Sequence, residues 1–148
     1  MSVQTEVMQQ MKEAMKSKDK IALESLRALK SAFLLANTSG SGVELSEADE
    51  IKIVQKLVKQ RKDSAAIFEQ QGRADLADPE LAQAAVLEKF LPTQMSEAEV
   101  KSVIQGIIAQ VGATSMKDMG KVMGMGSKEL AGKADGKMIS GIVKELLS

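Results

Sequence analysis

The stretch Phe90-Leu91-Pro92-Thr93-Gln94-Met95-Ser96 divides the chain into two helical regions of different composition. A proline disfavours helical backbone at the residue before it, so we expect a helix to end at Leu91. Of the 11 glycines, three precede this stretch and eight follow it. The sequence therefore predicts two domains, a helical bundle over residues 1–93 and a small, glycine-rich tail domain over residues 94–148.

Apolar residues on the N-terminal side of this break recur at steps of three and four, which is the spacing of one helix face. This periodicity predicts four helices, beginning near residues 3, 21, 46 and 78. The second is expected to end before Asn37, where the polar segment 37–42 favours a flexible loop. The third is long and should run to Gly72, since glycine is a common residue just past a helix end.

Two signals mark helix starts in this region. Ser46 and Asp49 have the spacing of a capping box, in which a hydroxyl and an acid three residues later satisfy free backbone amides. Asp78 followed by Pro79 predicts another start, with Asp78 as the cap and Pro79 at the first helical position. The side chains expected to face inward on this fourth helix are Leu81, Ala85, Val86 and Phe90.

The C-terminal region shows the same periodicity with more glycines. A capping box that begins at Ser96 predicts a helix that Gly112 ends. A shorter helix is expected around residues 116–123, with Gly126 in the cap or turn that follows it, and Asp135 should cap the last helix. Because no segment alternates with the period of a strand, the predicted fold class is all-α: a long-helix bundle followed by a small glycine-rich helical tail domain.

Composition excludes several kinds of active site. The 148 residues are 44% hydrophobic and 27% charged, which suits a packed core, but they include no His and no Cys. The commonest general base, the usual zinc ligands and the thiol nucleophile are therefore absent. The order of residues between Gly120 and Lys128 does not match a P-loop, which needs Gly-Lys-Ser or Gly-Lys-Thr after a strand. We expect no catalytic residues, no metal site and no cofactor.

Charge and the N-terminal residues bear on partners and location. Lys plus Arg equals Asp plus Glu at 20 each, so a basic footprint for nucleic acid must be local. Three Phe and no Tyr or Trp disfavour base stacking on single strands. The first residues lack the basic and apolar regions of a signal peptide, and no apolar run approaches the length of a membrane span. A cytoplasmic protein without membrane attachment is expected.

A candidate binding site lies near the C-terminus. Gly132 and Gly136 flank Lys133-Ala134-Asp135, and Lys137 follows. Small residues at the start of a helix allow a phosphate to approach backbone amides, and the two lysines would add charge. The alternative is an ordinary loop with solvated lysines. Residues 121–144 contain five lysines and two acids, so this segment carries a net charge of +3.

A second basic group lies on the long third helix and consists of Lys56, Lys59, Arg61 and Lys62. Asp63 and Glu69 follow on the same helix, so part of this group can form ion pairs along the helix surface. This pattern favours an ordinary salt-bridged solvent face over a binding site.

Longer segments carry a family pattern. They occur in order along nearly the whole chain, and two of them are Val58-Lys59-Gln60-Arg61-Lys62-Asp63-Ser64 and Gly132-Lys133-Ala134-Asp135-Gly136-Lys137. The full set of segments is residues 12–20, 26–32, 58–64, 72–76, 90–96, 117–124 and 132–137. Together they resemble the GatB/YqeY family in its free-standing YqeY form.

The resemblance implies a function linked to tRNA. In the amidotransferase that converts misacylated Glu-tRNA(Gln) or Asp-tRNA(Asn), the B subunit carries a similar two-part helical region, whose tail packs against the outer corner of tRNA. The catalytic cradle of that subunit lies upstream and is not resembled here. We therefore expect a non-catalytic tRNA-binding protein. The residues expected to bind tRNA are Lys121, Lys128, Gly132, Lys133, Asp135, Gly136, Lys137 and Lys144, with Lys59, Arg61 and Lys62 as a secondary basic patch.

Two other functions stay open at this point. One is an accessory subunit, or an enzyme of the carbon–nitrogen ligase class that uses glutamine as amido donor, with amidotransferase or translation-related proteins as partners. The other is a protein-interaction module that binds no RNA. A tRNA-binding assay and an amidation assay with charged tRNA distinguish the three functions.

Overall fold

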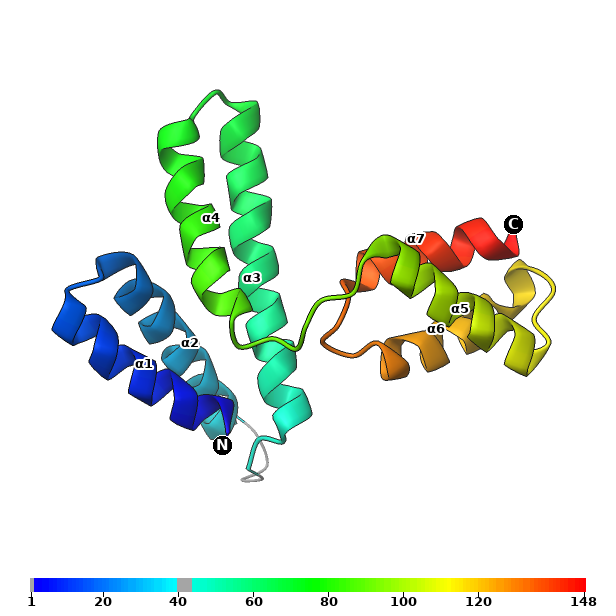
Figure 1. Ribbon diagram of the computed structural model, residues 1–148, viewed down its shortest axis with the longest axis horizontal. Coiled ribbons are helices and arrows are strands. Elements are labelled where there is room, and N and C mark those ends of the chain that lie inside the picture. Colours follow the sequence, from blue (N-terminus) through cyan, green and yellow to red (C-terminus); the bar gives the residue numbers. More distant parts are fainter. Residues whose placement is uncertain (1, 40–43) are drawn as a thin grey trace. The chain divides into compact units, whose positions relative to one another are not determined.

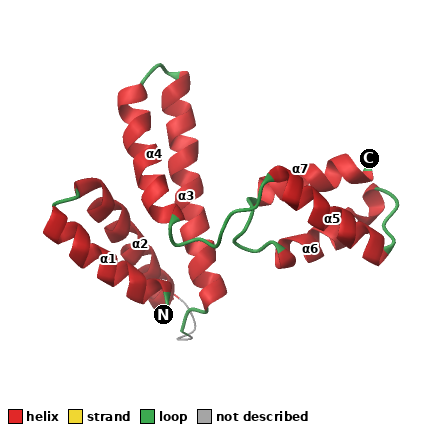
Figure 2. Cartoon of the chain, viewed as in Figure 1, coloured by secondary structure: helices red, strands yellow, loops and turns green. Residues whose placement is uncertain are grey.

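The computed structural model describes residues 2–39 and 44–148. Within these residues the fold contains seven α-helices, one short 3-10 helix and no strand (Figures 1 and 2). The helices group into two compact units, unit 1, which ends at Leu91, and unit 2, which spans Pro92–Ser148. The predicted fold class, an all-α long-helix bundle followed by a small glycine-rich helical tail, is confirmed.

Unit 1 consists of two helical hairpins. The helices are α1 (Val3–Ser17), α2 (Lys20–Ser39), α3 (Glu47–Gln70) and α4 (Ala74–Glu88). α1 lies beside α2 and α3 beside α4, and α2 also packs on both helices of the second hairpin (Figure 1). Each helix supplies at least one fully buried side chain to a shared core, which includes Val7, Leu29, Val54 and Leu87.

The start of α4 differs from the prediction. The helix begins at Ala74, and Pro79 lies inside it rather than at its first position, so the expected cap at Asp78 is wrong. The added turn has its own support: Arg73 forms two hydrogen bonds with Asp75, and the fully buried Ala77 donates its amide to the Arg73 carbonyl. These contacts offset the backbone hydrogen bond that a proline inside a helix cannot make.

The inward face of α4 also differs from the prediction. Leu81 is 41% exposed and Ala85 is exposed, whereas Ala84 and Leu87 are buried. Apolar residues occur on every side of this helix, so the three- and four-residue spacing does not single out one face. The expectation for Leu81 and Ala85 is therefore wrong, while Phe90 is buried as predicted.

The second helix is longer than predicted. α2 continues past Asn37 to Ser39, where the polar sequence favoured a loop. The Thr38 hydroxyl donates to the Leu35 carbonyl at 3.1 Å, so this polar side chain bonds within the helix instead of ending it. The rest of the expected loop, residues 40–42, lies outside the described residues.

A buried carboxylate joins α1 to α3. Glu50 is only 3% exposed, and its Oε2 accepts a hydrogen bond from the Gln4 amide at 3.1 Å. Gln4 lies in the first turn of α1, where backbone amides have no partner within the helix. A side chain from the first turn of α3 therefore caps a different helix, and its negative charge is favourable beside the N-terminus of α1.

Replacing Glu50 by alanine is expected to lower the free energy of unfolding by about 1–3 kcal/mol, because the half-buried Gln4 amide would lose its hydrogen-bond partner. Urea denaturation of the full chain measures this loss. The matched control is Glu47→Ala, since Glu47 is exposed in the first turn of the same helix and a surface change should cost at most about 0.5 kcal/mol. Equal losses in the two variants would contradict a capping role for Glu50.

Unit 2 is a smaller bundle with a separate core. Its elements are α5 (Glu97–Val111), the 3-10 helix η1 (Met116–Asp118), α6 (Met119–Glu129) and α7 (Gly136–Leu147). α6 packs on both α5 and α7 around a core that includes Val100, Ile104, Val122, Leu130 and Val143. No helix of the described residues is long and apolar enough to cross a membrane.

The helix caps of unit 2 follow the sequence signals with one exception. Ser96 begins α5 in a complete capping box, and Gly112 ends the helix with a φ of +68°, both as predicted. Gly126 was expected in a cap or turn, but it is buried inside α6, so this prediction is wrong. A Cβ atom at Gly126 would lie 2.9 Å from Ile104 Cδ1, so this glycine serves close packing against α5.

Candidate nucleic-acid interface

All the lysines predicted to bind tRNA in the tail lie in unit 2. They come from α6, from the loop that joins α6 to α7, and from α7 itself, and all five are exposed. The five are Lys121, Lys128, Lys133, Lys137 and Lys144. None of them takes part in the three ion pairs found among residues 2–39 and 44–148, so their charge is not neutralised by a bonded acid there.

Two helix faces combine lysines with bare backbone. Lys121 and Lys128 are seven residues apart, which places them on the same side of α6, and the exposed Gly124 lies between them. No atom lies within 4 Å of where a Cβ of Gly124 would be. The same arrangement occurs on α7, with Lys137, Gly141 and Lys144. Each helix therefore presents two cations with an exposed glycine between them.

The loop that carries Lys133 has a well-defined backbone. Gly132 is buried and has a φ of +78°, a conformation that glycine adopts without strain. The Lys133 amide donates to the Leu130 carbonyl at 2.9 Å, and Ala134 is buried in the core of unit 2. Lys133 is exposed between these two buried neighbours, so its charge projects from an ordered loop.

Asp135 caps α7 as predicted. Its side chain accepts a hydrogen bond from the Lys137 amide at 3.2 Å, and Gly136 is the first residue of the helix. The carboxylate already complements the helix dipole at this end and opposes a second anion at the same amide. The binding of a phosphate near α7 would therefore depend more on the lysine side chains than on the Lys137 amide, which already donates to Asp135. Direct contacts of Gly132, Asp135 and Gly136 with tRNA stay a prediction.

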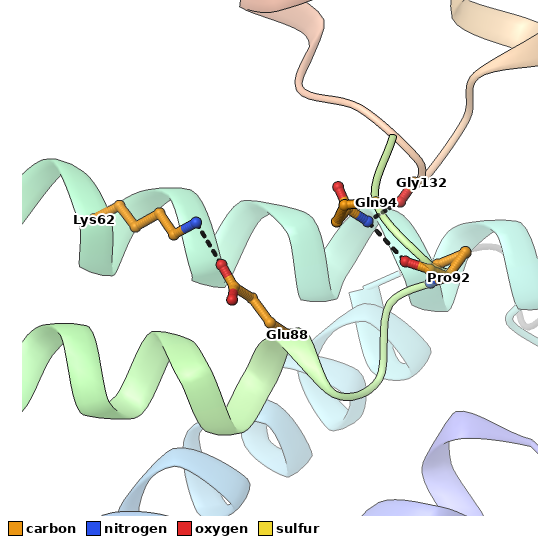
Figure 3. Close-up of polar contacts among 5 residues, drawn as sticks. All are labelled: Lys62, Glu88, Pro92, Gln94 and Gly132. Atoms are coloured by element: carbon orange, nitrogen blue, oxygen red, sulfur yellow. Dashed lines mark hydrogen bonds and ion pairs between the residues drawn. The ribbon is translucent and has the colours of Figure 1, made fainter. Parts of the chain in front are cut away.

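The secondary basic patch does not form a uniform surface. Lys62 of α3 forms an ion pair with Glu88 of α4 (Figure 3), whereas Lys59 is exposed. Arg61 is half-buried, and its Nε is a buried atom without a hydrogen-bond partner in the described residues. Lys62 thus has the salt-bridged solvent setting that the sequence favoured, although its partner comes from α4 rather than from its own helix.

The carboxyl groups with perturbed pKa values lie at helix starts in unit 1. Hydrogen bonds from the Ser46 hydroxyl and amide lower the pKa of Asp49. Hydrogen bonds from the Arg73 guanidinium lower the pKa of Asp75. Both groups therefore stay ionised at neutral pH, whereas a general acid needs a raised pKa.

One residue near the interface was part of a family segment but was not predicted as a site residue. Gln94 Nε2 donates to the Gly132 carbonyl at 2.7 Å and to the Pro92 carbonyl at 2.9 Å (Figure 3). Gln94 and Gly132 are 38 residues apart, so no spacing rule indicates the contact. Its position in the segment 90–96 was the only signal that the sequence offered.

Comparison with known proteins shows which family this sequence matches. A family model described as Yqey-like protein matches residues 4–147. The E subunit of glutamyl-tRNA(Gln) amidotransferase from Methanobrevibacter smithii is 46% identical over 57 residues, which cover 36% of this chain and 9% of that protein. The E subunit of the same enzyme from Thermococcus gammatolerans is 32% identical over 100 residues, which cover 65% of this chain and 16% of that protein.

A mitochondrial protein is similar over a larger share of its length. Altered inheritance of mitochondria protein 41, mitochondrial, from Clavispora lusitaniae is 30% identical over 105 residues, which cover 70% of this chain and 61% of that protein. The chain thus spans less than two thirds of each of these three relatives. The resemblance to the GatB/YqeY family is confirmed, and because the family model matches residues 4–147, the chain belongs to the family of Yqey-like proteins.

Proposed function

We propose that this chain is a non-catalytic tRNA-binding protein that contacts the outer corner of tRNA through unit 2. The observation that carries the proposal is the set of five exposed lysines on α6, α7 and the loop between them. Two relatives that match part of the chain are named as subunits of a glutamyl-tRNA(Gln) amidotransferase, which favours tRNA over other polyanions as the ligand.

Electrostatics sets the expected strength of binding. The segment 121–144 carries five lysines and two acids on a chain with no net charge, so its field is local and screened within about 10 Å at ordinary salt. With two or three phosphate contacts, affinity should be on the order of micromolar and should fall about ten- to fortyfold between roughly 50 and 200 mM salt. Because no Tyr or Trp is present, the shape and backbone of the RNA should be recognised rather than its bases.

The exposed glycines support the approach of an RNA backbone. A glycine inside a helix costs up to about 1 kcal/mol relative to alanine. Gly124 and Gly141 are exposed in helix interiors and lie beside lysines, and a Cβ would meet nothing within 4 Å at either position. Because these two glycines have no side chain, a phosphate backbone can approach the lysine-bearing faces of α6 and α7 closely.

Charge reversal in the tail tests the proposal. Lys133→Glu combined with Lys137→Glu is expected to abolish tRNA binding at low salt, since two attractive contacts become repulsive, and to leave helicity unchanged. Fluorescence anisotropy with total tRNA measures binding, and far-ultraviolet circular dichroism measures helicity. Lys59→Glu combined with Lys62→Glu in unit 1 carries the same charge change and should weaken binding less. Parent-like binding by the tail variant would show that the site is wrong.

A second candidate function is an accessory role in amidation, which the similarity to the two amidotransferase subunits favours. The chain alone should neither hydrolyse ATP nor amidate charged tRNA, because the sequence holds no nucleophile–base pair and no nucleotide loop. An amidation assay with and without added amidotransferase separates this role from tRNA binding alone. If the parent binds no tRNA at low salt, a protein-interaction module takes the place of the RNA function. A cytoplasmic location stays a prediction.

A further inference from the structure

The first residues of unit 2 form a segment that is bonded directly to the lysine-bearing loop between α6 and α7. Gln94 Nε2 donates to the carbonyl of Gly132 at 2.7 Å, and the Met95 amide donates to the carbonyl of Lys133 at 2.9 Å. Two consecutive carbonyls of the loop are therefore held by two consecutive residues of the segment. Figure 3 shows the first of these bonds, from Gln94 to Gly132. The second bond of Gln94, to the Pro92 carbonyl, uses the other hydrogen of its amide group and fixes the side chain in place.

These bonds hold the carbonyls of Gly132 and Lys133, whereas the amide of Lys133 is held by a contact within the loop. The Lys133 amide already bonds to the Leu130 carbonyl, so the peptide groups on both sides of Lys133 have partners. The Lys133 side chain is exposed, and none of the ion pairs among the described residues includes it. The loop thus combines a fixed backbone with a free cation, which is the arrangement that lowers the entropy cost of binding an anion.

We infer that Gln94 is a positioning residue for the proposed tRNA site. It touches no ligand and acts through the loop, by holding the Gly132 carbonyl so that Lys133 is presented in one place. This inference rests on the proposed function. It also predicts reciprocity: a ligand that orders the loop must equally favour the bonded form of residues 94 and 95.

Gln94→Ala removes the side-chain hydrogen bonds to the Gly132 and Pro92 carbonyls without changing the charge of the protein. Loss of one neutral hydrogen bond that orders the loop should weaken the binding of total tRNA roughly two- to tenfold at low salt. The control is Gln110→Ala, since Gln110 is exposed on α5 and its side chain makes no hydrogen bond among the described residues; its affinity should equal that of the parent. In the free protein, the amides of Met95 and Lys133 should exchange with solvent faster in Gln94→Ala than in either of the other proteins.

A double-mutant cycle separates positioning from general stability. Lys133→Gln removes the charge that Gln94 positions, so adding Gln94→Ala to it should weaken tRNA binding less than Gln94→Ala weakens the parent. A purely structural role would give the same factor in both backgrounds, and that result would overturn the inference. Equal affinities of a tRNA-binding parent and Gln94→Ala would overturn the inference alone. No binding by the parent at low salt would overturn the proposed function together with the inference.

Discussion

Replacing Leu29 by alanine is expected to lower the free energy of unfolding by about 2–5 kcal/mol. Leu29 lies in α2 at 0% exposure, within a core that receives side chains from all four helices of unit 1. The loss has two parts, the transfer free energy of the deleted carbon atoms and the cost of the cavity that they leave. Since small domains are stable by only about 5–15 kcal/mol, this substitution should remove a large fraction of the stability of unit 1.

The same helix supplies a control of the same residue type. Leu35 of α2 is 69% exposed, so Leu35→Ala deletes equal atoms from a solvated position and should change stability by no more than about 0.5 kcal/mol. Guanidinium denaturation of the full chain, with amide exchange of α1–α4 as the local readout, measures both variants. Similar losses for Leu29→Ala and Leu35→Ala would mean that burial in this helix is not as described.

Local signals allowed several elements to be predicted from sequence. The capping boxes at Ser46 and Ser96 are both present as expected, because the groups involved are only three residues apart in the chain. Gly112 ends α5 in the left-handed conformation for the same reason, since the turn that needs it is local. At these three positions, a signal within a few residues of the helix end was enough to predict where the helix begins or ends.

Features that depend on distant partners could not be predicted. Glu50 has the sequence position of a first-turn acid in α3, yet it is buried and caps α1. Leu81 fits an apolar stripe but is exposed, because contacts with α2 and α3 determine which face of α4 is buried. The candidate interface shows the same limit. The basic segment 121–144 could be identified from its charge, whereas the bond between Gln94 and Gly132 required the fold.

Gly124 and Gly126 of α6 are two residues apart but differ in their surroundings. Gly126 is buried, and a Cβ there would lie 2.9 Å from Ile104 Cδ1 and 3.6 Å from Ile139 Cγ2. Ile104 is itself 0% exposed, so it cannot move aside without displacing other core side chains. Gly126→Val is therefore expected to destabilise unit 2 by about 1–3 kcal/mol, the usual cost of overpacking a core.

Gly124→Val should have the opposite pattern of effects. A Cβ at Gly124 meets nothing within 4 Å, and valine is slightly better than glycine inside a helix, so stability should stay within about 0.5 kcal/mol of the parent. Its side chain, however, would stand between Lys121 and Lys128 and should hinder the approach of an RNA backbone. Thermal denaturation and tRNA anisotropy on both variants give the test. A loss of stability in Gly124→Val, or unchanged stability in Gly126→Val, would contradict the packing of α6. Unchanged tRNA affinity in Gly124→Val would remove this face of α6 from the proposed interface.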